Sequence, residues 1–187
     1  MANEGLDGQK QLINLIKRCS RGDRKAQEHL YYSYYGYCIS IALRFSGTRE
    51  MAEEIVNDSF LKIFTKIESH NTDKSFKAWI RKIVVNTALD YNRKDLRNFY
   101  TVELIEEKHD SVVENIEFPH AEEIINLLQK LSPMYRLVFN LHVMEGYSHE
   151  EIAQMLDISV NTSRSNLSRA KERVVELVEK QRLYAKS

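Results

Sequence analysis

Residues 148–171 read SHEEIAQMLDISVNTSRSNLSRAK and predict two short helices joined by a tight turn. Ser148 with Glu151 has the spacing of a capping box, which starts the first helix. Asp157 is expected to form the turn, because Asp tolerates the left-handed backbone conformation better than most residues. Ser159 then precedes a basic segment and is the expected N-cap of the second helix. The stretch is therefore typical of a helix-turn-helix.

The second of these helices is basic and rich in small polar residues, as a helix lying in a major groove would be. Arg commonly reads guanine and Asn adenine, while Ser and Thr suit phosphate or either base. The alternative is an ordinary amphipathic helix pair with a solvated polar face. The candidate duplex-contacting residues are Asn161, Thr162, Arg164, Ser165, Asn166, Ser168 and Arg169.

Upstream, apolar residues recur at spacings of three and four through residues 12–45, 52–67 and 76–91, which predicts four helices. A second helical group begins near residue 124. Two prolines and six glycines leave few turn signals for many strands, so the predicted fold class is all-α. The expected helix starts are Asp23, Thr48, Ser75 and Ser132 before Pro133, and the expected ends are Gly22, Gly47 as a C′ residue, and Gly146.

Residues 95–119 lose the helical period and are acidic, so they are interpreted as a flexible linker with a short helical stretch near 102–107. The predicted organisation is two small helical domains, 1–94 and 120–187, the second containing the helix-turn-helix.

The overall net charge of zero conceals an uneven distribution of charge. Residues 1–94 carry a net +5, residues 95–119 a net −5, residues 120–159 a net −4 and residues 160–187 a net +4. Two basic segments separated by an acidic one suit a protein that contacts a polyanion at two places. The alternative is a set of solvated helix faces with a chance imbalance.

Two further polar faces are candidates for binding. Lys82, Asn86, Asp90 and Arg93 form one stripe along a helix, which either binds nucleic acid or is a salt-bridged surface. The nearby Trp79 is either core or a platform for an unpaired base. On the preceding helix, Glu53, Glu54, Asn57 and Asp58 share one side, which is either solvated or docks a basic partner.

Enzymatic and metal sites lack support in the sequence. Cys19 and Cys38 form no CxxC pair, and His149-Glu150-Glu151 lacks the second His of a zinc-protease motif. We find no phosphate-binding Gly loop and no nucleophile motif. Neither a membrane span nor a signal peptide is evident. The expectation is a cytoplasmic protein that is not an enzyme and has no metal, no cofactor and no membrane insertion.

Three strings occur in an order that resembles an RNA polymerase sigma factor of the extracytoplasmic-function (ECF) group. They are AEEIVNDSFLK (52–62), FKAWIRKIVVNTALDYNRK (76–94) and LSPMYRLVF (131–139), the last continuing into the helix-turn-helix. The resemblance covers roughly residues 9–180. It departs from the usual pattern at Asn57, where Gln is more common, and at Asn161, Ser163 and Asn166, where Gly, Val and Arg are usual.

The resemblance implies a function and partners. Glu53, Glu54, Asn57 and Asp58 would dock the clamp helices of the polymerase β′ subunit, and the second domain would contact the β flap. A loop before the 76–94 helix would help to melt the minus-ten promoter element. The implied minus-ten residues are Asn71, Lys74, Trp79, Lys82, Asn86 and Arg93.

The helix-turn-helix, 148–171, would read the minus-thirty-five element as duplex, and an anti-sigma factor is an implied partner. Two other functions stay open on the sequence: a stand-alone helix-turn-helix regulator, and a helical adaptor that binds no nucleic acid.

Overall fold

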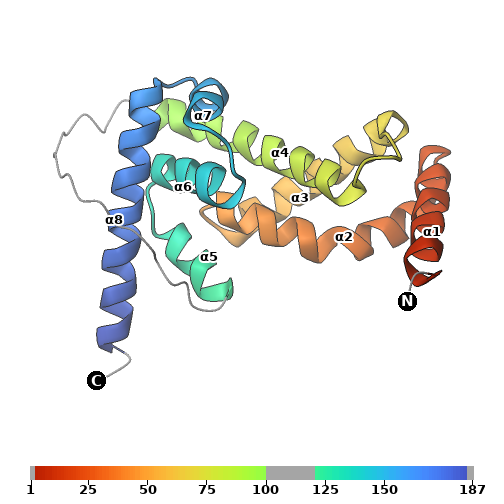
Figure 1. Ribbon diagram of the computed structural model, residues 1–187, viewed down its shortest axis with the longest axis horizontal. Coiled ribbons are helices and arrows are strands. Elements are labelled where there is room, and N and C mark those ends of the chain that lie inside the picture. The colour runs from red at the N-terminus through yellow and green to blue at the C-terminus, as the bar shows by residue number, and fades with distance from the viewer. Residues whose placement is uncertain (1–2, 100–120, 185–187) are drawn as a thin grey trace. The chain divides into compact units, whose positions relative to one another are not determined.

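The computed structural model describes residues 3–99 and 121–184, and all regular elements in these ranges are helical (Figure 1). The predicted all-α fold class is therefore confirmed. The short helical stretch expected near 102–107 lies outside the described residues. In chain order the elements are α1 (Asn3–Ser20), α2 (Arg24–Phe45), α3 (Arg49–Lys66), the 3-10 turn η1 (Ile67–Ser69), α4 (Phe76–Phe99), α5 (Ala121–Gln129), α6 (Pro133–Phe139), the π-turn η2 (Asn140–Met144), α7 (His149–Leu156) and α8 (Val160–Tyr184).

The chain divides into two compact units. The first comprises Met1–Ala42 and Glu50–Thr87, and the second comprises Leu43–Arg49 and Ala88–Ser187. The last turn of α2 and the C-terminal part of α4 thus belong to the second unit. The domain boundaries at 94 and 120 that the sequence suggests stay a prediction.

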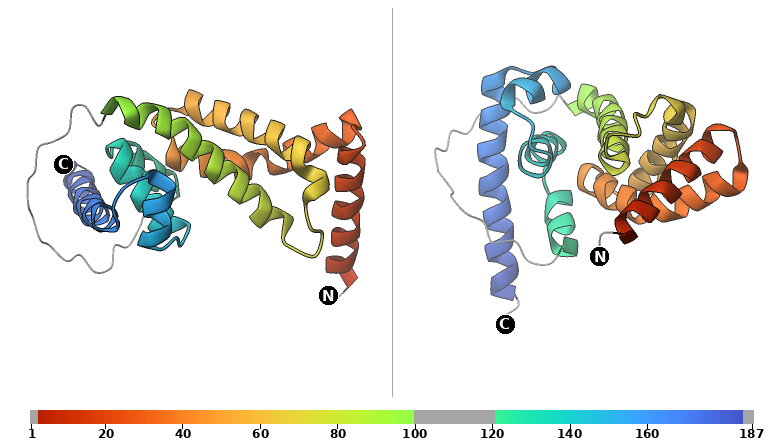
Figure 2. Two further views of the ribbon diagram at one scale, coloured as in Figure 1. Left: turned by 90° about the horizontal axis from the view of Figure 1, so that it is seen from above. Right: turned by 45° about the vertical axis from the view of Figure 1, so that its right-hand side comes forward.

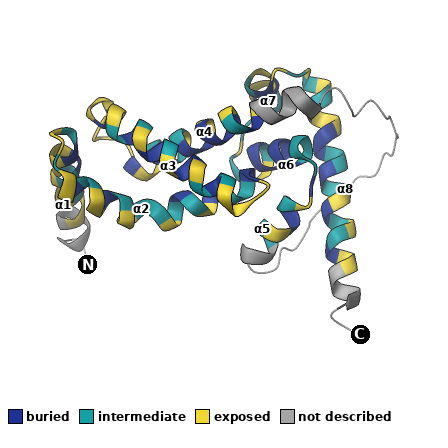
Figure 3. Cartoon of the chain, turned by 180° about the vertical axis from the view of Figure 1, so that it is seen from behind, coloured by how far each residue is buried: buried dark blue, intermediate teal, exposed yellow. Residues whose placement is uncertain are grey.

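The core of the first unit consists of buried apolar side chains from α2, α3 and α4. In the same unit, α1 packs beside η1. One side of each helix is buried and the other exposed, as the colouring of Figure 3 shows. This arrangement follows from the apolar spacing of the sequence. The fully buried side chains include Leu30, Ile41, Ile55, Ile63 and Ile80.

The start of α2 is capped as predicted. Asp23 Oδ1 accepts the Ala26 backbone N–H at 3.1 Å, and Asp23 Oδ2 lies 2.7 Å from Arg18 Nη2. The hydrogen bond from Arg18, together with that from the Ala26 backbone, lowers the pKa of the Asp23 carboxyl. Gly22, with φ of 78°, supplies the left-handed residue that ends α1.

The end of α2 differs from the prediction. Gly47 is not among the glycines with positive φ, so it is not a left-handed C′ residue, and α2 stops at Phe45. Asn92 Nδ2 instead donates to the Phe45 carbonyl at 3.2 Å. A side chain from α4 therefore satisfies a helix-end carbonyl that a glycine turn would otherwise have satisfied.

In the second unit, α5, α6 and α7 pack against α8, and the left view of Figure 2 looks nearly along α8. As predicted, α6 begins at Pro133. Ser132 precedes it but makes no capping hydrogen bond, and its Oγ is buried without a hydrogen-bond partner among the described residues. The helix then widens into η2 and ends before Gly146, whose φ is 79°.

The helix-turn-helix forms as the sequence predicts. Ser148 Oγ accepts the Glu151 N–H at 3.2 Å, and Glu151 Oε2 accepts the Ser148 N–H at 2.8 Å, which is a complete capping box. Asp157 adopts φ 56° and ψ 48°, the left-handed conformation expected at the turn. Ser159 Oγ accepts the Thr162 N–H at 3.0 Å and caps α8.

Candidate functional site

The first candidate surface is the polar side of α3. Glu54 and Asn57 are exposed, whereas Glu53 and Asp58 are half-buried, and all four lie beside a buried apolar stripe. The spacing of the sequence therefore places them on one face, as expected. A concentration of carboxylates around an amide suits a basic partner.

Tyr31, on α2, joins this face and was not expected there. Its hydroxyl donates to Asn57 Oδ1 at 3.2 Å, so the Asn57 amide nitrogen is the group that stays available to a partner. The ring lies 4.6 Å from the Phe60 ring and thus packs α2 against α3. Burial raises the pKa of Tyr31, and nearby tyrosines and Glu53 raise it further, so the hydroxyl stays protonated at neutral pH.

Large apolar side chains are exposed near the same helices. Tyr32 on α2 is 72% exposed, and Leu61 on α3 is 67% exposed. Tyr34, also on α2, packs with its ring 5.5 Å from that of Phe76. The Tyr32 ring lies 5.6 Å from the Tyr31 ring in a T-shaped arrangement.

The second candidate surface is a polar stripe on α4. Lys82, Asn86 and Arg93 are all exposed, as their spacing predicts. Asp90 Oδ1 lies 3.7 Å from Arg93 Nη1, so the predicted pair along the helix is present. Both side chains are about half exposed, and such a pair contributes little to stability. Arg93 Nη2 also donates to the Met155 carbonyl of α7 at 2.5 Å, so the guanidinium is exposed but already has two partners.

A short exposed loop, residues 71–75, leads into α4. Asn71 Oδ1 accepts the Asp73 N–H at 2.9 Å, and the Asn71 carbonyl accepts the Lys74 N–H at 3.0 Å, which defines a compact turn. Ser75 Oγ accepts the Ala78 N–H at 3.3 Å and caps α4, as predicted. Asn71 and Lys74 are both exposed. The turn thus presents an amide and an ammonium group to solvent.

Three rings lie under this loop and form an aromatic clasp, which we define as His70, Phe76 and Trp79. The His70 ring is 5.1 Å from each of the other two, and the Phe76 and Trp79 rings stack at 5.5 Å with an interplanar angle of 24°. His70 and Phe76 are buried, and Trp79 is half-buried. Trp79 is therefore largely a packing residue, and sequence spacing alone did not reveal His70.

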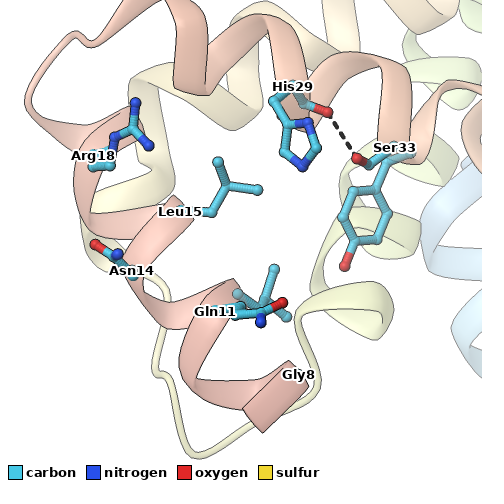
Figure 4. A pocket seen from close by; sticks show the side chains of 9 residues that line it. Gly8, Gln11, Asn14, Leu15, Arg18, His29 and Ser33 are labelled. Carbon is cyan, nitrogen blue, oxygen red and sulfur yellow. Dashed lines mark hydrogen bonds between the residues drawn. The ribbon is translucent and has the colours of Figure 1, made fainter.

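Two cavities open in the first unit. One, of about 390 Å³, lies between α1 and α2 and is lined by polar side chains that include Asn14, Arg18 and His29 (Figure 4). The other, of about 330 Å³, lies between α1 and the loop before α4. His70, Phe76 and the loop residues Thr72–Ser75 line the second cavity, so the clasp forms part of its wall.

The third candidate surface is the N-terminal half of α8. Asn161, Arg164 and Ser165 are exposed, and Thr162, Ser168 and Arg169 are half-buried. The expectation that Asn166 faces outward is wrong, because its side chain is only 8% exposed. Position 166 lies on the same stripe as Ser163, Leu167 and Ala170, which are buried against the rest of the unit.

Contacts between α7 and α8 orient side chains at the exposed surface of the helix-turn-helix. Arg164 Nη2 lies 3.5 Å from Glu150 Oε1, and both side chains are more than half exposed. His149 Nδ1 is 2.9 Å from the buried Ser163 Oγ, and its ring stacks on His142 at 4.5 Å and 14°. Burial lowers the pKa of His149, and His142 and Arg164 lower it further.

Sites for metals, thiol chemistry or membrane insertion are not found in the described parts of the chain. Among residues 3–99 and 121–184 no group of His, Cys, Asp and Glu side chains could hold a metal ion. Cys19 and Cys38 are buried and free, and burial raises the pKa of the Cys38 thiol to about 12. Within the same ranges, no helix has the length and apolar character to cross a membrane.

Two family models match the chain. The model for sigma-70 region 2 matches residues 30–98, and the model for sigma-70 region 4 matches residues 121–174. Together the two matches extend over the three candidate surfaces described above.

Curated relatives are similar over most of their length. The chain is 27% identical over 173 residues to the ECF RNA polymerase sigma-E factor of Escherichia coli K12, covering 86% of this chain and 90% of the relative. It is 26% identical over 179 residues to the RNA polymerase sigma-H factor of Pseudomonas aeruginosa, covering 89% and 93%.

Among solved structures, the chain is similar to the sigma factor RpoE in complex with the anti-sigma factor NepR from Bartonella quintana. That alignment has a TM-score of 0.49 and 22% identity, and it covers 81% of this chain and 96% of the other. Similarity to CnrH in complex with the cytosolic domain of CnrY has a TM-score of 0.47 and 20% identity, covering 89% and 96%.

Proposed function

This chain belongs to the sigma-70 family as an ECF-type RNA polymerase sigma factor, and from that premise we propose which of its surfaces performs each step of initiation. As an alternative sigma factor it directs core RNA polymerase to promoters. One observation supports the assignment of these surfaces to steps of initiation. Sigma-70 regions 2 and 4 occur in order, and each has an exposed polar surface on a folded helical scaffold.

The acidic side of α3 docks the core enzyme. Glu53, Glu54, Asn57 and Asp58 form its polar centre, and the β′ clamp helices are the partner. The Tyr31 hydroxyl fixes the Asn57 carbonyl oxygen and leaves the amide N–H groups for the partner. Carboxylates on a rigid helix steer a basic surface into register without needing to rearrange.

The loop before α4 and the α4 stripe act on the minus-ten element. Lys74, Lys82 and Arg93 supply cations for backbone phosphates, and Asn71 and Asn86 supply amides for the edge of an unpaired base. Trp79, half-buried in the aromatic clasp, supports the loop. Separating two strands requires that exposed bases be held individually, which amides next to cations can do.

The exposed part of α8 reads the minus-thirty-five element as duplex DNA. Arg164, Arg169 and Asn161 are the candidates for base edges, and Thr162, Ser165 and Ser168 for phosphates. Asn166 is buried, so we assign it to the packing of α8 and not to base recognition. The same unit is the candidate for contact with the β flap.

The two domains and the linker between them can be assigned to the same steps of initiation. We assign 1–94 to core and minus-ten binding, 95–119 to a linker and 120–187 to minus-thirty-five binding. The net −5 of 95–119 opposes contact with DNA and suits the positively charged channel that later holds RNA. The protein acts in the cytoplasm as an initiation factor and not as an enzyme, with an anti-sigma factor as a further partner.

Reconstituted transcription tests the proposal. The purified chain is added to core polymerase on a pool of promoter fragments, and the 5′ ends of the transcripts are sequenced. Initiation at defined sites, dependent on the chain, is the expected result. DNA binding without initiation would indicate a stand-alone helix-turn-helix regulator, and no salt-dependent DNA binding would indicate an adaptor.

A further inference from the structure

The loop of residues 71–75 is exposed along its whole length, yet both of its ends are fixed by buried rings. His70 immediately precedes the loop and is 8% exposed, and Phe76 immediately follows it and is 3% exposed. Because the two rings contact each other at 5.1 Å, they close the loop at its base. The conformation of the exposed residues therefore depends on the clasp beneath them.

His70 occupies the central place in the clasp. It follows η1 with an extended backbone, φ −70° and ψ 123°, and its N–H bonds to the Ile67 carbonyl at 3.3 Å. This geometry turns the imidazole inward, where it meets Phe76 and Trp79 at the same distance of 5.1 Å. Removing the imidazole would take away one ring contact from each of Phe76 and Trp79.

The surroundings of His70 favour the neutral form of its ring. Burial lowers the pKa of His70, while a hydrogen bond with the Lys74 backbone raises it by a smaller amount. The titratable and charged groups that line the cavity beside His70 are Tyr34 of α2, Asp73 and Lys74 of the loop, and Lys77 of α4. Protonation would place a cation between two apolar rings, with two lysines nearby and one carboxylate to offset them.

We propose that His70 is a positioning residue for strand opening: its imidazole closes the aromatic clasp and holds loop 71–75 in the conformation that captures an unpaired base. The proposal rests on the function proposed above for that loop. It extends that function to a residue that contacts neither phosphate nor base. It also makes promoter opening sensitive to acid, because protonated His70 leaves the clasp.

The test measures open complexes by permanganate reactivity of unpaired thymines, using holoenzyme on duplex and on pre-melted templates. His70→Ala should open the duplex about tenfold more slowly, since it loses two ring contacts. It should act normally on the pre-melted template and bind core polymerase as wild type does. His70→Phe should restore opening, and it should remove the loss that wild type shows as the pH falls below 6.5.

Three outcomes are decisive. Duplex opening by His70→Ala at the wild-type rate overturns the proposal, and so does an equal defect on duplex and pre-melted templates. Should His70→Ala fail to bind core polymerase, the pH profiles of wild type and His70→Phe decide, and identical profiles overturn the proposal. The double variant Asn71→Ala/Asn86→Ala is the control for the underlying function. If that variant also opens duplex normally, the assignment of the loop itself is wrong.

Discussion

Arg164, on the exposed side of α8, lies 3.5 Å from Glu150 on α7, so an arginine proposed to contact duplex DNA is paired with a carboxylate in the free protein. Both side chains are more than half exposed, and a pair of this kind is worth at most about 1 kcal/mol. The pair thus fixes the direction of Arg164 without preventing its transfer to DNA.

Glu150→Gln should therefore strengthen binding to all duplexes, because it frees Arg164 and removes a negative charge near the phosphates. We expect a gain of about twofold to fivefold at low salt that shrinks as salt is added. Glu176→Gln is the matched control, since Glu176 pairs with Arg173 further along α8 at 2.6 Å. Fluorescence anisotropy with labelled duplex measures both, and equal effects would contradict the role of Arg164.

Arg164→Ala and Arg169→Ala should each weaken promoter binding. The loss should be about 1–3 kcal/mol and specific to one sequence where the arginine reads guanine, and uniform across sequences where it meets phosphate. Binding to promoter and scrambled duplexes across a salt series separates these cases. If both variants bind as wild type does, the reading face of α8 has been assigned incorrectly.

Asp58→Arg combined with Glu54→Arg should abolish binding to core polymerase, because the substitutions reverse the charge of the docking face. Both positions lie on the polar side of α3, so the helical circular dichroism spectrum should be unchanged. Glu179→Arg on α8, an exposed charge reversal on another helix, is the control. Retention of core polymerase by the double variant in a pull-down would refute the docking assignment.

His149 should titrate below its ordinary pKa of 6.5, because burial and the neighbouring His142, Arg164 and Lys171 disfavour its charged form, opposed only by Glu150. The unfolded chain then binds more protons than the folded one between the folded pKa and 6.5. The contribution of His149 to stability is therefore complete above about pH 6.5 and is lost as the pH falls towards the folded value. An NMR titration should show this shift, and His142→Gln should reduce it; a midpoint at 6.5 would contradict it.

Asp157→Gly should stabilise the helix-turn-helix by about 1 kcal/mol, because a non-glycine residue at φ 56° is strained. Asp157→Val should destabilise it by about 1–2 kcal/mol, since a branched side chain fits the left-handed conformation poorly. Urea denaturation of the full chain measures both. A loss of stability in the glycine variant would mean that the aspartate side chain has a role beyond tolerating the turn.

Local signals predicted much of the structure. The capping box of Ser148 and Glu151 involves residues three apart, so the sequence contains everything that its geometry needs. The exposed stripe of Lys82, Asn86 and Arg93 follows from helical spacing in the same way. Such features depend only on residues within one or two helical turns of each other. They can therefore be predicted from the sequence alone.

Features that depend on distant residues were missed or mistaken. Asn166 was expected to face outward because it is polar, but the inward stripe of α8 includes position 166. Gly47 was expected to end α2, but Asn92 reaches the Phe45 carbonyl from α4. His70 gave no local signal, since its importance comes from rings six and nine residues away.

The division of labour between the two regions is tested most directly by comparing two variants in one opening assay. Asn71→Ala/Asn86→Ala and Arg164→Ala are each assembled with core polymerase on duplex and on template mismatched around the minus-ten element. The account predicts that the double variant forms closed complexes normally, loses permanganate reactivity on duplex and regains it on the mismatched template. Arg164→Ala should be impaired in forming the closed complex on both templates. Equal defects of the double variant on the two templates would contradict the account.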